Sequence, residues 1–232
     1  MYRSWRHVAA TAGLIILPLA FLLGFAHISH VETRVLIQNL LVSLGRITVA
    51  YILSALIGWG CAVLFYKGRR SDVALPVFDV LQSFPTYAAL PLAVLYWGAS
   101  NFTVIVFLVL AIVWPIFFSV ISSLKLIRRD WQEAVEISGL HGWDYVRKFL
   151  IPVSMPGLMT GSVIGLGDGW EALVATEIIV GLHTGLGAFF QSSSDNLQVT
   201  LLGIFGLLLV IFAINKLIWL PLLNRSHQMT EE

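Results

Sequence analysis

Ionisable side chains interrupt otherwise apolar stretches of this chain, and four of them could act together. Arg46 lies in one stretch, and Asp168, Glu171 and Glu177 lie together in another. A charge inside a membrane segment is costly, so such residues usually pair with one another or border a polar path through the protein. Asp168 and Glu171 share a helix face, whereas Glu177 is turned by about 180° from Asp168 on a regular helix. Two interpretations stay open: an internal ion pair, for instance of Arg46 with one carboxylate, and a path through the membrane that all four residues border.

The composition indicates a helical membrane protein. Of the 232 residues, 58% are hydrophobic and 12% are charged, and the mean hydropathy is +0.86. Soluble domains carry about 25% charged residues, so we expect an all-α integral membrane protein. Apolar runs of about 20 residues are long enough to cross the bilayer as helices.

Six such runs are present, and we expect each to form one membrane span. The first resembles a signal peptide, but it is longer than a usual signal core and no small-x-small cleavage pattern follows it. We therefore expect it to be retained. The chain would then be a single transmembrane domain, residues 1–232, with spans at about 8–26, 42–66, 74–97, 102–124, 155–181 and 197–222.

Positive charges are distributed unequally between the loops. One set of loops holds 11 of the 14 Lys and Arg residues, the opposite set holds only Arg34, and Arg46 and Lys216 lie within spans. Loops rich in Lys and Arg stay in the cytoplasm. This pattern predicts a multi-pass membrane protein with both termini and the 125–152 loop on the cytoplasmic side.

The segment EAVEISGLHGWDYVRKFLIP is a polar, helix-patterned island between apolar runs. Asp130 is expected to cap a helix whose first turn carries Glu133, because acidic groups are favourable at a helix N-terminus. Gly139 and Gly142 permit a turn, and Trp143 to Leu150 are expected to form a second short helix. A polar helix–turn–helix in an apolar chain indicates a docking element for a soluble partner.

The spacing within this island resembles the EAA loop of permease subunits of bacterial ABC importers. The loop pattern is E-A-A, three residues, G, nine residues and I-x-L-P, with apolar replacements here at Val135 and Phe149. The resemblance implies that residues 125–152 are a coupling loop between spans four and five that docks in a groove of a cytoplasmic ATPase subunit. It implies coupling roles for Glu133 as the acidic contact, Ala134 as the close-packing residue, Gly139 as the turn, and also for Glu136 and Pro152.

Other residues are similar to the nitrate/sulfonate/taurine-type branch of that family: Phe84-Pro85 with Leu90-Pro91, Tyr96-Trp97-Gly98, and Gly181 to Gly187. The resemblance covers most of the chain and implies a core permease region at about 37–223. It implies a subunit that forms the translocation pathway for a small anionic or zwitterionic solute, similar to nitrate, a sulfonate, taurine or bicarbonate.

The resemblance also implies partners. A second permease copy, giving a homodimer within membrane lipid, would complete the pathway. Cytoplasmic ATPase subunits would dock inside, and a periplasmic or lipoprotein substrate-binding protein would deliver the solute. The chain has no G-x-x-x-x-G-K-[ST] phosphate loop. We therefore expect a non-enzymatic subunit with ATP and Mg held by the ATPase, with no catalytic, cofactor or metal residues and no nucleic-acid partner.

Small residues and prolines recur within two of the spans. Four glycines at intervals of four form a stripe along the fifth span, which permits close approach of another helix. This stripe indicates either close packing or the surface on which two permease copies meet. Pro85 and Pro91 are expected to kink or break the third span. The glycines of the stripe are Gly157, Gly161, Gly165 and Gly169.

Two other classes of protein were weighed against this interpretation. An ion-gradient-driven secondary transporter would use Arg46, Asp168 and Glu171 as a relay, and carboxylates in the path would repel an anionic solute. An intramembrane enzyme would need a nucleophile–base pair or a metal motif, and the sequence has neither. The pattern from Leu186 to Gln191 predicts a short helix on the outer face, as a gate, a receptor contact or a plain connection.

Overall fold

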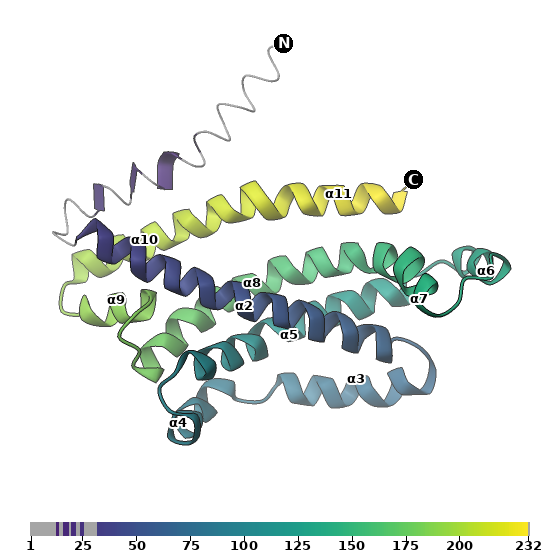
Figure 1. Cartoon of the computed structure of the whole chain (residues 1–232), viewed down its shortest axis with the longest axis horizontal. Helices are drawn as coiled ribbons and strands as arrows, with labels where there is room; N and C mark the ends of the chain where they lie inside the picture. Colours follow the sequence, from purple (N-terminus) through teal and green to yellow (C-terminus); the bar gives the residue numbers. More distant parts are fainter. Residues whose placement is uncertain (1–12, 14–15, 19, 22–23, 26–31, 232) are drawn as a thin grey trace, which may run out of the picture.

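The computed structural model describes residues 13, 16–18, 20–21, 24–25 and 32–231. Its regular structure in this part of the chain is entirely helical, so the prediction of an all-α membrane protein is confirmed. The expected first span at about 8–26 lies mostly outside the described residues, as does the N-terminus. The helices run along one long axis, with α6 and α9 at opposite ends (Figure 1).

Three long helices form the bundle. Helix α5 is the most enclosed of them, because its apolar residues face neighbours on several sides, and Ile112 and Ile116 are fully buried. Its first turn is capped by Ser100, whose hydroxyl accepts a hydrogen bond from the Thr103 amide. The three helices are α2 (Thr33–Phe65), α5 (Asn101–Lys125) and α8 (Ile151–Val180).

The glycine stripe of α8 lies against α5 of the same chain. A Cβ atom added at Gly157 would lie 2.6 Å from the Ser119 carbonyl oxygen, and one added at Gly161 would lie 2.6 Å from the Cα of Ile116. Gly165 and Gly169 approach Ile112 in the same way. The stripe therefore packs two backbones together within one chain. It is not the surface on which two copies meet, because α5 already covers it.

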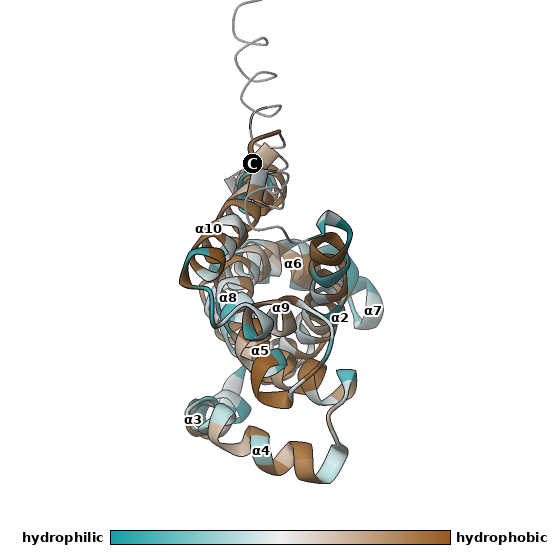
Figure 2. Cartoon of the chain, turned by 90° about the vertical axis from the view of Figure 1, so that its left-hand side faces the viewer, coloured by the Kyte–Doolittle hydropathy of each residue, from teal (hydrophilic) through white to brown (hydrophobic). Residues whose placement is uncertain are grey.

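The third predicted span is broken. Helix α3 (Gly68–Gln82) and helix α4 (Thr86–Trp97) meet at an angle of 76°. Pro85 stands at the N-cap of α4, where its missing amide costs no helical hydrogen bond, so the expected break is present there. Pro91 is accommodated within α4. Both helices lie to one side of the bundle (Figures 1 and 2).

The chain ends in a long helical arm. It consists of α10 (Leu197–Ile214), a π-helical turn η2 (Asn215–Trp219) and α11 (Leu220–Glu231), and it lies along the bundle (Figure 1). The residues of α10 are mostly hydrophobic (Figure 2), and several large ones are exposed, among them Leu201, Ile204 and Leu208. The short helix α9 (Leu186–Ser192) precedes this arm, as the sequence predicted for this segment.

The helices extend beyond the predicted membrane spans at several ends. Helix α2 begins at Thr33 and not near residue 42, α8 begins at Ile151 and not near 155, and the C-terminal helices continue past 222. Hydropathy marks only the apolar part of a helix, and a helix can continue through polar residues beyond that part. Among the described residues, four helices are long and apolar enough to cross a membrane, or five if α3 and α4 count as one span. The count of six stays a prediction.

Candidate functional site

The helix–turn–helix island projects from one end of the bundle. Helix α6 (Arg129–Ile137) has no buried residue. Asp130 does not cap it, contrary to the prediction: Arg128 is the N-cap, and its guanidinium donates to both Asp130 oxygens, at 2.7 and 3.1 Å. The carboxylate is therefore occupied by its neighbour. It still lies in the first turn, where a negative charge is favourable.

Two glycines shape the turn after α6, as predicted. Gly139 has φ +66° and Gly142 has φ +57°, a backbone conformation that side-chain-bearing residues rarely adopt. The His141 ring contacts the Gly139 carbonyl, with 2.6 Å between Nδ1 and the oxygen. The chain then continues through α7 (Gly142–Tyr145) and a π-helical turn η1 (Val146–Leu150) into α8. The predicted second helix is therefore present and leads directly into a span.

The exposed side of this island mixes acidic and apolar groups. The Glu133 side chain is 63% exposed and contacts Arg129 only loosely, at 3.4 Å. Ala134 and Glu136 are also exposed. Ile137 and Trp143 are exposed by 88% and 71%. These two large apolar side chains therefore stand exposed on an otherwise polar projection.

A cluster of aromatic residues and one lysine ties the island to the bundle. The Tyr66 and Tyr145 hydroxyls lie 3.1 Å apart, and Lys67 donates to the Tyr145 hydroxyl at 3.4 Å. Phe149 and Leu150 are buried just before α8. The island is thus fixed to the ends of both α2 and α8.

A second site lies within the membrane-length helices. Asp168 and Glu171 project from the same face of α8 into a cavity of about 630 Å³ between α3, α4, α5 and α8. Their shared face was predicted from the three-residue spacing. Sequence reasoning missed Asp79, which lines the same cavity from α3. Asp79 follows an apolar run and precedes Gln82 by three residues, so a polar face on α3 was the available signal. The lining also includes Gln82, Thr86, Tyr87 and Trp114.

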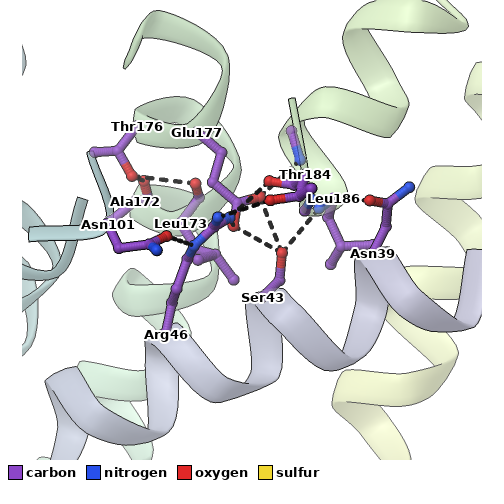
Figure 3. A network of polar contacts seen from close by, with 12 residues as sticks. Asn39, Ser43, Arg46, Asn101, Ala172, Leu173, Thr176, Glu177, Thr184 and Leu186 are labelled. Carbon is purple, nitrogen blue, oxygen red and sulfur yellow. Dashed lines mark hydrogen bonds and ion pairs between the residues drawn. The ribbon is translucent and has the colours of Figure 1, made fainter. Parts of the chain in front are cut away.

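Arg46 and Glu177 are placed apart from this cavity. They form a buried ion pair, with 2.5 Å between Arg46 Nη1 and Glu177 Oε1, and the Glu177 side chain has no exposed surface (Figure 3). Ser43 donates to both oxygens of Glu177, at 2.7 and 3.0 Å. The structure therefore divides the four predicted path residues into a closed pair and two exposed carboxylates. Among the described residues, no group of three or more His, Cys, Asp or Glu residues could hold a metal ion.

A bundle of membrane-length helices with a polar projection at one end and a polar cavity among its spans defines an integral membrane protein of the permease class. The chain belongs to the family of binding-protein-dependent transport system inner membrane components, whose sequence profile matches residues 54–222. The predicted resemblance to this family is confirmed.

Relatives of this chain include nitrate, bicarbonate and taurine permease proteins, which belong to the branch that the sequence resembles. The chain is 31% identical over 175 residues to the nitrate import permease protein NrtB of Leptolyngbya laminosa, covering 72% of this chain and 62% of the relative. It is 29% identical over 177 residues to the bicarbonate transport system permease protein CmpB of Synechocystis (73% and 63%). It is 31% identical over 178 residues to the taurine transport system permease protein TauC of Escherichia coli (75% and 64%). The matched region thus spans less than two thirds of these relatives' length.

Proposed function

We propose that this chain is the permease subunit of an ATP-driven ABC importer. It forms the pathway for a small solute and couples to a separate ATPase subunit. The observation that carries the proposal is the exposed α6–α7 island, fixed to two membrane helices at one end of the bundle. Membership of a family of transport-system membrane components supports the same proposal.

Helix α6 is the proposed coupling helix. Glu133, Ala134 and Glu136 face outward, and Gly139 makes the turn. A cytoplasmic ATPase groove that accepts this helix would cover Ile137 and Trp143, which are otherwise exposed to water. Pro152 in the first turn of α8 transfers any movement of the island directly to a membrane span. ATP and Mg would be held by the ATPase subunit.

The acidic cavity is the proposed pathway surface. Carboxylates exposed at membrane depth are costly against lipid, so Asp168 and Glu171 favour a neighbour that is water or protein. A second permease copy opposite this face would enclose the path, giving a homodimer. Arg46 and Glu177 lie outside the exposed lining.

The proposed solute is small and either anionic or zwitterionic, as the names of the nitrate, bicarbonate and taurine relatives suggest. Of these two kinds of solute, the residues that line the acidic cavity favour a zwitterion. Asp79, Asp168 and Glu171 would repel a simple anion, while they would attract the ammonium group of a taurine-like molecule. A substrate-binding protein would deliver the solute on the outer side.

The proposed orientation follows the loop charges: an inner-membrane protein with both termini and α6 in the cytoplasm. The outer face then carries α9 and the 181–185 loop.

The test is assembly with the ATPase. Wild type, Glu133→Lys and Gly139→Asp are purified with the ATPase subunit and reconstituted in proteoliposomes with the binding protein. Asp195→Lys, an equally exposed charge reversal at the other end of the bundle, is the matched control. We expect the two island variants to lose ATPase binding and solute-stimulated ATP hydrolysis, and the control to keep ATPase binding. Wild-type coupling in the island variants would contradict the proposal, and uptake driven by an ion gradient without the ATPase would select a secondary transporter.

A further inference from the structure

The short helix α9 is held in place by side chains of two membrane helices. It lies at the end of the bundle opposite α6 (Figure 1). The first amide groups of a helix have no partner within the helix itself. Here the Gly185 amide donates to Asn39 at 2.9 Å, the Leu186 amide donates to Ser43 at 2.8 Å, and the Gly187 amide donates to Glu177 at 2.8 Å. Three successive amides are thus satisfied from α2 and α8.

Arg46 fixes the loop just before α9. Its Nη1 donates to the Thr184 carbonyl at 2.8 Å, and its Nη2 donates to the Thr184 hydroxyl at 3.1 Å. Its Nε donates to Asn101, the first residue of α5, at 2.9 Å. With the Glu177 ion pair, one guanidinium joins α2, α5, α8 and the 181–185 loop (Figure 3).

Two glycines permit this close approach. Gly185 has φ +114°, and a Cβ atom there would lie 2.5 Å from both Arg46 Nη1 and Glu177 Oε1. A Cβ atom at Gly187 would overlap the Cβ atom of Glu177. Side-chain-bearing residues at either position would push α9 away from the ion pair. Within the segment from Gly181 to Gly187, Gly185 and Gly187 therefore leave the space that the Arg46–Glu177 pair occupies.

The contacts of α9 with α10 involve no charged group: the Thr200 hydroxyl donates to the Ser193 carbonyl at the end of α9, at 2.9 Å, and the other contacts are apolar. Phe189 and Phe190 pack on Gly203 of α10, where contacts are between rings and backbone. His183 and Gln191 line an open cavity of about 570 Å³ at the same end. Breaking the buried ion pair would leave an uncompensated charge at low dielectric, whereas the ring contacts with α10 involve no charge.

We propose that Arg46 and Glu177 are positioning residues that clamp α9 to α2 and α8 as one rigid wall of the outer gate. On the orientation proposed above, movement at the outer end then takes place between α9 and α10, and the pair does not contact the solute. The rigidity itself is a property of the single chain and is independent of the ATPase partner.

The test measures distances by double electron–electron resonance in lipid nanodiscs, without the ATPase, with labelled chains diluted in an excess of unlabelled chains so that each distance lies within one copy. Spin labels are placed at Val35 on α2 and Gln191 on α9, both exposed, in a Cys61→Ser background. A second pair, Val49 on α2 and Ile164 on α8, reports on the bundle itself. We expect a narrow distribution for both pairs in the parent chain. Glu177→Gln and Gly187→Ala are expected to broaden the α2–α9 distribution and leave the α2–α8 distribution narrow.

The control is Asp168→Asn, which removes an exposed carboxylate from the same helix and is expected to change neither distribution. An α2–α9 distribution as narrow in Glu177→Gln as in the parent would overturn the proposal, and so would a broad one in the parent. If Glu177→Gln does not fold, Gly187→Ala decides: it keeps both charges and places a methyl group against the Cβ atom of Glu177, so a distribution as narrow as the parent's would equally overturn the proposal. Because no ATPase is present, these outcomes do not depend on whether α6 is a coupling helix.

Discussion

Arg46 and Glu177 lie 131 positions apart in the sequence and form a buried ion pair between α2 and α8. The pair separates two kinds of intramembrane charge in this protein. Glu177 is fully enclosed and satisfied by Arg46, Ser43 and the Gly187 amide. Asp168 and Glu171, on the same helix, are exposed to a cavity. The first kind joins two helices inside the bundle, and the second kind is the one proposed here to meet a solute.

Removing one member of the pair is expected to destabilise the protein strongly. Glu177→Leu leaves Arg46 buried without its counter-ion, which costs about 3–5 kcal/mol. The double variant Arg46→Met with Glu177→Leu removes both charges and is expected to cost less than the sum of the two single variants. Unfolding in mixed micelles with increasing denaturing detergent measures the free energies. Strict additivity would show that the two side chains do not interact.

The glycine stripe offers a matched pair of substitutions. Gly161→Ala places a methyl group 2.6 Å from the Ile116 Cα and is expected to cost about 1–3 kcal/mol through overpacking. Gly167→Ala, on the open side of the same helix, meets nothing within 4 Å and is expected to gain up to about 1 kcal/mol from helix propensity. Thermal unfolding of the two variants in the same detergent compares them. Equal melting temperatures would contradict the close α5–α8 packing.

The turn after α6 depends on backbone conformation and not on space. Gly139→Ala meets no neighbour within 4 Å, but its φ of +66° costs a side-chain-bearing residue about 1–2 kcal/mol. We expect weaker binding of the ATPase subunit with little change in the melting of the bundle. Gly45→Ala, in regular α2 and equally uncrowded, is the control. Binding is measured by titrating the ATPase onto nanodisc-embedded protein. Equal affinity of the two variants for the ATPase subunit would show that ATPase binding does not depend on the Gly139 turn.

The exposed carboxylates are expected to influence the choice of solute more than stability. Asp168→Asn with Glu171→Gln lowers the negative charge of the cavity, so uptake of taurine is expected to fall and uptake of nitrate to rise relative to wild type. Uptake is measured with the reconstituted transporter and the matching binding protein. The free energy of unfolding should change by no more than about 0.5 kcal/mol, because both carboxylates are exposed. Unchanged uptake of both solutes would place the pathway elsewhere.

Local spacing predicted much of this structure. The turn glycines and the short helix near Leu186 follow from residue types a few positions apart, and so does the shared face of Asp168 and Glu171. The partner of Glu177 could only be offered as one of two interpretations, because helical spacing says nothing about which span lies alongside. Asp79 was missed for the same reason: its place in the cavity depends on how α3 leans against α5 and α8.

The π-helical turn Val146–Leu150 sets how helix α8 is rotated about its own axis relative to the α6–α7 island. The Ile151 amide reaches back to the Val146 carbonyl, five residues earlier, so this turn contains one residue more than an α-helical turn. Deleting that residue would restore regular winding and rotate all of α8 by about 100° relative to the island. The direction in which Asp168 points is therefore tied to the length of a segment at the far end of its helix. Two chains of this family that differ by one residue there would present different faces of α8 to the same neighbour.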